Sequence, residues 1–205
     1  PLQFDPTTAR AISLGNSTIW RDEYLGFLDG NMFDGDHQWQ LAAIEPHHRG
    51  RMPVVLIHGT ASSPARWADM VNDLLSDPEI RNHFEFWFFS YATGNPIPYS
   101  AMQLRRSLEN AIRNLGGVQA DPALGHITLI GHSQGGLLAK MLVIDAGDRL
   151  WNGLISTPLN RLTLSNDARN LLQSTLFPSA MPEVQRPFSF PRRSTVATSP
   201  RSPSR

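Results

Sequence analysis

LIGHSQGG, residues 129–136, joins an apolar run to a helical pattern through a serine that lies between glycines. Its centre, Gly131 to Gly135, matches the G-x-S-x-G pattern of a nucleophile elbow, a tight turn between a strand and a helix. The serine of such a turn has a strained backbone, and side chains two residues to either side would collide. The pattern therefore predicts an exposed, nucleophilic Ser133 hydroxyl, backed by the positive end of the following helix. The alternative interpretation is a plain tight turn with a solvated serine.

Three apolar runs around this turn are typical of buried strands and lie at residues 54–58, 84–91 and 126–130. A helical pattern follows each of them. Strands that alternate with helices in this way form a parallel sheet through right-handed crossovers. The sequence therefore predicts an α/β fold, with a parallel sheet covered by helices on both faces.

Capping residues mark the expected ends of the helices. Ser63 suits the start of the first helix, and Ser100 with Gln103 forms a capping box for the second. The glycine pair at Gly116 ends that second helix, and Gly147 is expected to end the third.

The chain divides into three regions by composition. Residues 1–52 are irregular, with a predicted hairpin around Asp29-Gly30, and residues 53–177 carry the strand and helix pattern. Residues 178–205 contain six Pro, six Ser, five Arg and one acidic residue. Because such a composition without an apolar period does not build strands, we expect this tail to be disordered.

A second motif lies at the end of the first strand, in VVLIHGT, residues 54–60. The loop after such a strand supplies half of an oxyanion hole when a nucleophile elbow is present. The backbone N–H groups of Thr60 and Gln134 are the expected pair, with Gly59 keeping the loop close. A strand-end glycine followed by an ordinary capping loop is the alternative.

Three segments together carry a resemblance to a known family: PVVLIHGTASSPARW (53–67), FWFFSYATGNP (86–96) and ITLIGHSQGGLLAKM (127–141). They resemble bacterial α/β-hydrolases of the lipase and esterase type, over about residues 20–177, with 58–59 and 131–136 as anchors. The resemblance implies hydrolysis of small-molecule or lipid carboxylic esters through a Ser–His–Asp/Glu triad, without a cofactor. It makes Ser133 the nucleophile and Thr60 and Gln134 the oxyanion-hole residues.

The triad departs from this family's pattern, in which an acid and then a histidine follow the serine along the chain. All seven histidines precede Ser133, at positions 37, 47, 48, 58, 83, 126 and 132. No histidine is therefore in the expected position, and the triad acid is unassigned. Acidic residues that follow the serine are Asp145, Asp148, Asp167 and Glu183; Asp167 is better explained as the first turn of a helix capped by Ser165.

The upstream histidines do not replace the missing base. We expect His58 to be part of the loop structure and the His132 side chain to point away from Ser133. His126 begins a strand at the opposite end of the sheet, and His47 and His48 are expected to be solvated in a polar loop. Without a triad partner, only residual catalysis from the oxyanion hole and binding is expected.

Two interpretations of the tail stay open: a basic tail that binds an anionic partner, or a change of reading frame between residues 177 and 191. The second makes the chain the N-terminal half of a hydrolase, weak or inactive as a fragment. Two further functions use the same features. A non-catalytic binding protein could have kept the fold and lost the triad, and an acyltransferase or thioesterase could use the same elbow.

The overall composition excludes chemistry that depends on cysteine, namely disulfides, thiolate metal sites and a cysteine nucleophile. The 18 basic and 18 acidic residues balance, which gives no electrostatic argument for nucleic acid, and the chain has no cysteine. No run approaches the length of a membrane span, and no targeting signal is visible, so the compartment stays open.

Two local clusters contain residue types that occur in binding sites. The aspartates at 29, 34 and 36 with His37 fit no metal-ligand spacing and are interpreted as turn residues. The aromatic run around Trp87 is interpreted as a buried strand rather than a lipid pocket. The loop at 91–98 lies where ligands approach such sheets.

Overall fold

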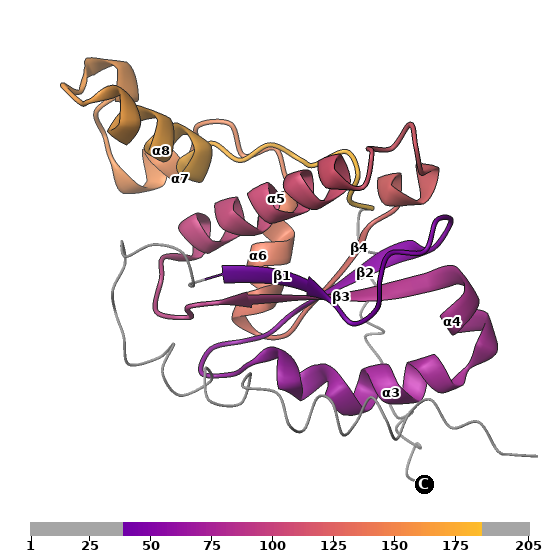
Figure 1. Cartoon of the computed structure of the whole chain (residues 1–205). Coiled ribbons are helices and arrows are strands. Elements are labelled where there is room, and N and C mark those ends of the chain that lie inside the picture. The colour runs from indigo at the N-terminus through magenta and orange to yellow at the C-terminus, as the bar shows by residue number, and fades with distance from the viewer. Residues whose placement is uncertain (1–38, 186–205) are drawn as a thin grey trace, which may run out of the picture.

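A four-stranded mixed sheet is the centre of the computed structural model, which describes residues 39–185 (Figure 1). The strands are β1 (Trp39–Ala43), β2 (Met52–Ile57), β3 (Phe84–Tyr91) and β4 (Thr128–Gly131). Their order in the sheet is β1-β3-β2-β4. β2 pairs in parallel with both β3 and β4, whereas β1 pairs antiparallel with β3. The three predicted parallel strands are thus confirmed, with small differences at their ends.

The strand β1 was not predicted, because residues 1–52 were interpreted as irregular or hairpin-like. It is five residues long and pairs on one side only, with β3. A short edge strand of this kind carries little periodicity in the sequence. The sheet is therefore mixed rather than wholly parallel. The hairpin expected at Asp29-Gly30 lies outside the described residues.

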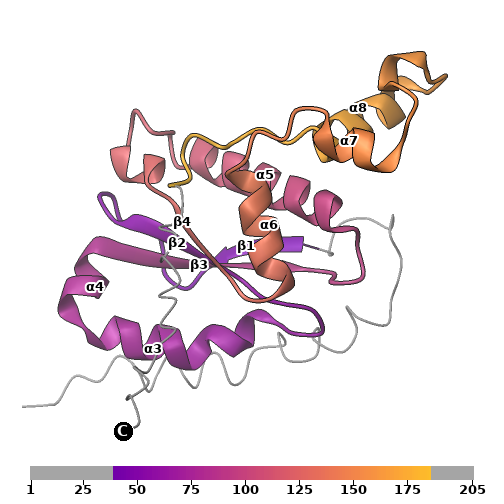
Figure 2. The same ribbon diagram turned by 180° about the vertical axis from the view of Figure 1, so that it is seen from behind.

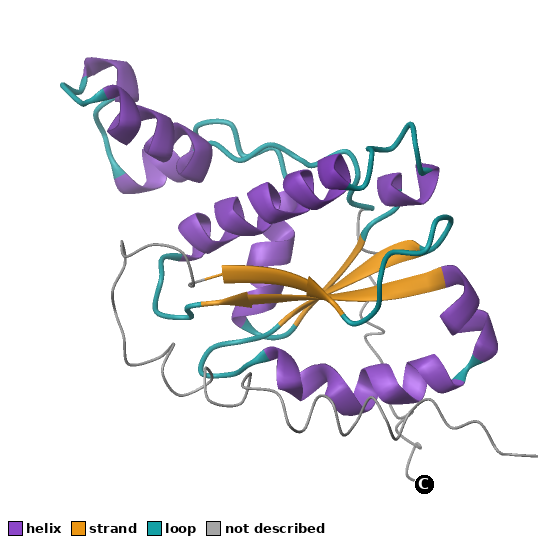
Figure 3. Cartoon of the chain, in the orientation of Figure 1, coloured by secondary structure: helices purple, strands orange, loops and turns teal. Residues whose placement is uncertain are grey.

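Helices cover both faces of the sheet, as predicted (Figures 1, 2 and 3). One face is covered by α5 (Ile97–Asn114) and α6 (Gln134–Leu142), and the other by α3 (Ala68–Ser76) and α4 (Pro78–His83). Two more helices, α7 (Arg149–Leu154) and α8 (Asn166–Leu176), follow α6 and project past α5. Short 3₁₀ helices complete the elements: η1 (Pro64–Trp67), η2 (Pro122–Gly125) and η3 (Leu159–Arg161).

The core consists of two apolar clusters, one on each face of the sheet. Trp87 and Phe89 of β3 pack with α5 and α6, whereas Phe86 and Phe88 of the same strand pack with α3. Alternate residues of β3 therefore enter opposite clusters, and both faces of the strand are covered. The interpretation of this aromatic run as a buried strand is confirmed.

Some predicted helix ends are confirmed. The Ser63 side chain accepts a hydrogen bond from the Ala65 amide at the start of η1, which leads into α3. Ser165 likewise caps α8 through the Ala168 amide, and Asp167 lies in the first turn of that helix. At the end of α5, Gly116 has a φ of +94°, which a residue with a side chain rarely adopts.

Two predicted helix ends are wrong. The helix α5 begins at Ile97, so Ser100 lies inside the first turn and does not cap it. Prolines at 96 and 98 fix the early start, because proline suits the first positions of a helix. The helix α6 ends at Leu142, five residues before Gly147. There the chain turns away, and the Ala146 amide donates to the Pro178 carbonyl.

Residues 178–185 pack on the core, so the change in composition at 178 does not coincide with the end of the packed structure. Met181 and Val184 are buried in the larger apolar cluster. Val184 also forms a parallel bridge with Ile127, directly before β4. The expected disorder of the remaining tail concerns residues outside the described range.

Candidate active site

The parallel strands bring three loops together at one edge of the sheet. Ile57 of β2 is in register with Gly131 of β4 and with Phe89 of β3. The chain therefore leaves all three strands at nearly the same level. The loops that begin at His58, Ala92 and His132 lie at this carboxyl edge, where ligands bind in open α/β sheets.

Ser133 occupies the turn between β4 and α6 with φ +52° and ψ −120°. This conformation is strained for a residue with a side chain, as the motif predicted, and Ser133 is exposed. A Cβ on Gly131 would overlap the backbone of Gly135 and Gly136, and a Cβ on Gly135 would overlap the carbonyl oxygen of Ile57. Glycine at both positions thus allows α6 to pack directly against β2 and β4.

Side chains of the three loops are joined by hydrogen bonds beside Ser133. The Thr60 hydroxyl donates to Gln134 Oε1 over 2.9 Å, and Gln134 Nε2 donates to the Thr93 carbonyl over 3.2 Å. The Thr93 hydroxyl accepts from the Ala61 amide over 3.3 Å. Thr60 and Gln134, which the sequence placed in one oxyanion hole, are therefore neighbours. Within residues 39–185, neither backbone amide donates to a backbone carbonyl.

His58 is held in the loop structure and is not free to act as a base. Its Nδ1 is 3.0 Å from the Gly59 carbonyl oxygen, and its Nε2 accepts from the Tyr91 amide over 3.4 Å. The ring is 2% exposed and stacks on the Tyr91 ring. Burial lowers the pKa of His58, and the hydrogen bond to the Gly59 carbonyl only partly opposes this shift. The structural role expected for His58 is confirmed.

His132 lines a pocket next to the elbow. The other lining residues are His58, Ser62, Arg66 and Trp67, and the pocket has a volume of about 260 Å³. The His132 Nδ1 atom and the Ser133 Cβ atom lie 2.9 and 3.0 Å from where a Cβ on Gly59 would be. The His132 ring and the Ser133 side chain therefore flank Gly59 together. Within the described part of the chain, the Ser133 hydroxyl has no hydrogen-bond partner.

The acidic residues that follow Ser133 are engaged elsewhere. Asp145 accepts from the Ala180 amide, and Asp148 accepts from the Asn152 side chain one turn along α7. Asp167 belongs to α8, as described above, and Glu183 precedes the bridge to Ile127. None of them makes a hydrogen bond to a residue of the elbow. The triad acid therefore stays unassigned among residues 39–185.

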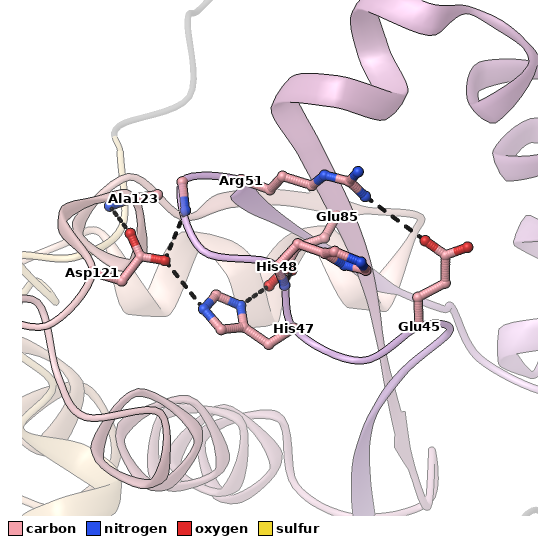
Figure 4. Close-up of polar contacts among 8 residues, drawn as sticks. Glu45, His47, His48, Arg51, Glu85, Asp121 and Ala123 are labelled. Atoms are coloured by element: carbon pink, nitrogen blue, oxygen red, sulfur yellow. Dashed lines mark hydrogen bonds and ion pairs between the residues drawn. The ribbon is translucent and has the colours of Figure 1, made fainter.

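His47 is not solvated, which corrects the prediction for this residue (Figure 4). Its Nδ1 is 2.8 Å from Glu85 Oε1, and its Nε2 is 3.1 Å from Asp121 Oδ2. The two carboxylates are 38 and 74 residues away in the sequence, so no local pattern could predict the contact. Glu85 lies near the start of β3, and hence at the amino end of the sheet, opposite Ser133. His48 is exposed, as expected, and so is His126, which lies before β4 beside Gln185.

The pocket residues Ser62, Arg66 and Trp67 were not predicted as functional. Trp67 was assigned only to the apolar face of a helix, which it does join. The signal that could have found them is their place in the chain, because the loop after a parallel strand lies at the carboxyl edge. In residues 39–185, no group of three or more His, Cys, Asp or Glu side chains could hold a metal ion. The cluster of aspartates at 29–36 with His37 lies outside this range.

Comparison with known proteins identifies the family. A model described as the alpha/beta hydrolase family matches residues 54–203, which is well over half of the chain and includes the Pro-, Ser- and Arg-rich stretch. The chain therefore belongs to the alpha/beta hydrolase family. Neither a curated protein nor a solved structure matches the sequence. Across the described residues, no helix has both the length and the apolar character required to span a bilayer.

Proposed function

We propose that this alpha/beta hydrolase acts on carboxylic esters through a nucleophilic serine. Ser133 attacks the ester carbonyl carbon, and the carbonyl oxygen becomes an oxyanion. The backbone N–H groups of Thr60 and Gln134 hold that oxyanion. The Ser133 proton passes through solvent water to the leaving alkoxide, which departs as the alcohol. A water molecule then releases the acid from the acyl-enzyme.

One observation carries the proposal: the strained, exposed Ser133 between β4 and α6. A non-glycine residue is held at φ +52° only where the surroundings determine its conformation, and such strain is concentrated at functional sites. Here the close backbone packing at Gly131 and Gly135 holds Ser133 in this conformation. The hydrogen bond between Thr60 and Gln134 supports the second half of the proposal, because it fixes the two oxyanion-hole residues side by side.

Activation of Ser133 is the step that the described residues do not supply. A serine hydroxyl is a weak nucleophile until a base takes its proton. His58 is locked and buried, and the neighbouring His132, although exposed, makes no hydrogen bond to the Ser133 hydroxyl. We therefore propose slow turnover for this chain. The same observation favours a second candidate function, an alpha/beta hydrolase that binds its ligand without turnover.

External imidazole tests the proposal, because it can replace the missing base. The hydrolysis of p-nitrophenyl butyrate is measured with wild type and with Ser133→Ala, at increasing imidazole concentration. The rate with Ser133→Ala is subtracted, since imidazole itself cleaves activated esters. We expect a saturable, imidazole-dependent rate in wild type only.

The two candidate functions give different results in this experiment. If wild type and Ser133→Ala give equal rates at every imidazole concentration while both are folded, the esterase proposal is wrong and the binding protein is favoured. Thr60→Ala is a useful further variant. It removes the side-chain bond to Gln134 but keeps the backbone amide, so we expect a moderate loss of the rescued rate rather than its abolition.

A further inference from the structure

The pocket lined by His58, Ser62, Arg66, Trp67 and His132 carries polar groups that have no partner within the protein. The Ser62 side chain is 8% exposed, and its hydroxyl is buried without a hydrogen bond among residues 39–185. The indole N–H of Trp67 is buried in the same unpaired state. Buried polar groups are nearly always paired in native proteins, so each such group requires an explanation. Both atoms have almost no accessible surface, however, so a ligand in the pocket does not reach them, and the charged group of the wall that it can reach is Arg66.

The chemistry of the wall indicates what kind of ligand this is. The guanidinium of Arg66 is a hydrogen-bond donor only, and it is always charged. Arg66 is exposed and makes no ion pair within the described part of the chain. No acidic side chain lines the pocket. The wall is therefore complementary to a group that is rich in acceptor oxygens and negatively charged.

The pocket is also next to the reacting serine. His132 belongs to its wall, and the His132 ring and the Ser133 side chain flank Gly59 together. A volume of about 260 Å³ is small beside the 300–1,000 Å³ that is typical of small-molecule sites. The occupant is thus a short group and not a long acyl chain.

From these observations we infer that the pocket selects short esters bearing a carboxylate, which Arg66 binds while the ester carbonyl lies at Ser133. This inference rests on the proposed function and names its substrate class. Arg66 is a specificity residue here, since it binds the substrate's charge and takes no part in the chemical step.

Binding is tested without turnover, in the Ser133→Ala protein. Monomethyl glutarate, which carries a carboxylate, is compared with the neutral ester methyl valerate by titration of tryptophan fluorescence. We expect monomethyl glutarate to bind about tenfold tighter or more, because the charge-assisted contact to arginine is lost with the neutral ester. Adding Arg66→Gln should abolish the preference, and adding Arg106→Gln, an exposed arginine on α5, should keep it.

The outcomes of this titration test the inference about the pocket separately from the proposed esterase function. Equal affinity for the two esters, or a preference that survives Arg66→Gln, overturns the inference. A fluorescence change that persists after Trp67→Phe also overturns it, because the ligand would then bind elsewhere. A carboxylate preference found without imidazole-rescued hydrolysis of either p-nitrophenyl butyrate or mono-p-nitrophenyl glutarate supports the pocket and rejects the proposed function. Rescued hydrolysis without a carboxylate preference supports the proposed function and overturns the inference about the pocket.

Discussion

The polar side chains at the two ends of the sheet differ in whether they are hydrogen-bonded within the protein. At the amino end, the ring of His47 lies between Glu85 and Asp121 (Figure 4). All four oxygens of these carboxylates accept a hydrogen bond, since the amides of residues 48, 50 and 123 complete the set. At the carboxyl end, the buried hydroxyl of Ser62 has no partner within residues 39–185, and the hydroxyl of Ser133 is exposed.

Backbone strain follows the same division. Among the described residues, the non-glycine residues with positive φ are Ala61 and Ser133, and both lie at the carboxyl end. Strain and unpaired polar groups cost folding free energy, and a native protein keeps them mainly where a ligand or a reaction uses them. The comparison therefore indicates that the amino end stabilises the fold, whereas the carboxyl end performs the function.

The largest expected effect comes from a methyl group at the carboxyl end. In Gly135→Ala the new Cβ would overlap the carbonyl oxygen of Ile57, which is backbone and cannot rotate away. We expect a loss of more than about 4 kcal/mol in the free energy of unfolding, or no folded protein at all. Urea unfolding followed by circular dichroism measures it.

The neighbouring glycine provides the control. A Cβ on Gly136 meets its nearest atom at 3.5 Å, which is an ordinary contact. Because alanine favours a helix over glycine by about 1 kcal/mol, Gly136→Ala should leave stability unchanged or slightly raised. Similar stabilities for the two variants would show that close packing at the elbow does not hold Ser133 in its strained conformation.

The next effect is at the amino end. His47→Ala leaves Glu85 and Asp121 as buried carboxylates without their shared partner, with side chains only 7% and 4% exposed. Leaving a buried polar group without its hydrogen-bond partner costs about 1–3 kcal/mol, and more when the group is charged. We expect a loss of stability in this range and, in the protein that remains folded, an unchanged imidazole-rescued rate at Ser133.

His48→Ala is the matched control for this variant. His48 joins the network only through its backbone amide, which donates to Glu85 Oε2, and its side chain is exposed. Its substitution should change the free energy of unfolding by less than about 0.5 kcal/mol. If His47→Ala were as stable as His48→Ala, the amino end would not have the stabilising role assigned to it.

The contrast between the two ends also explains what the sequence could predict. The elbow is local: strand, glycines, serine and helix lie within residues 128–142, and the structure reproduces them in the predicted order. The charge network is not local, because His47 meets side chains that are far away in the sequence. A histidine in a polar loop gives no sign of such partners, and it was therefore predicted to be solvated.

The pocket was missed for a different reason. Trp67 lies on the apolar face that continues into α3, and the sequence offers no way to separate packing from pocket lining. Its unpaired N–H becomes visible only when all neighbours are placed. The predicted start of α5 was wrong because two local signals competed. The prolines at 96 and 98 start the helix before the capping box at Ser100.

A pair of adjacent serines gives a smaller effect. Ser63 and Ser62 are both buried, but the Ser63 hydroxyl caps η1 and the Ser62 hydroxyl has no partner. Ser63→Ala should lower the free energy of unfolding by about 1 kcal/mol. Ser62→Ala removes an unsatisfied buried group, so we expect unchanged or slightly higher stability. A clear loss of stability in Ser62→Ala would mean that this hydroxyl is paired and stabilises the fold.

The smallest effect concerns pH and the buried His58. Because burial lowers its pKa in the folded protein, the unfolded chain takes up a proton below about pH 6.5 while the folded protein still excludes it. Stability should therefore fall as the pH drops from 7.5 to 5.5. Urea unfolding at both values should show a smaller fall for His58→Phe, which keeps a ring against Tyr91 but does not titrate.

This pH window separates His58 from the charge network at the other end of the sheet. Asp121 is buried, which by itself would raise its pKa, but the amides of Gly50 and Ala123 and the ring of His47 outweigh burial and lower the pKa. Its contribution is present above about pH 4 and is lost only as the pH falls below that value. An equal fall for wild type and His58→Phe between pH 7.5 and 5.5 would show that His58 takes up its proton in the folded state, and hence that the ring is not locked between Gly59 and Tyr91.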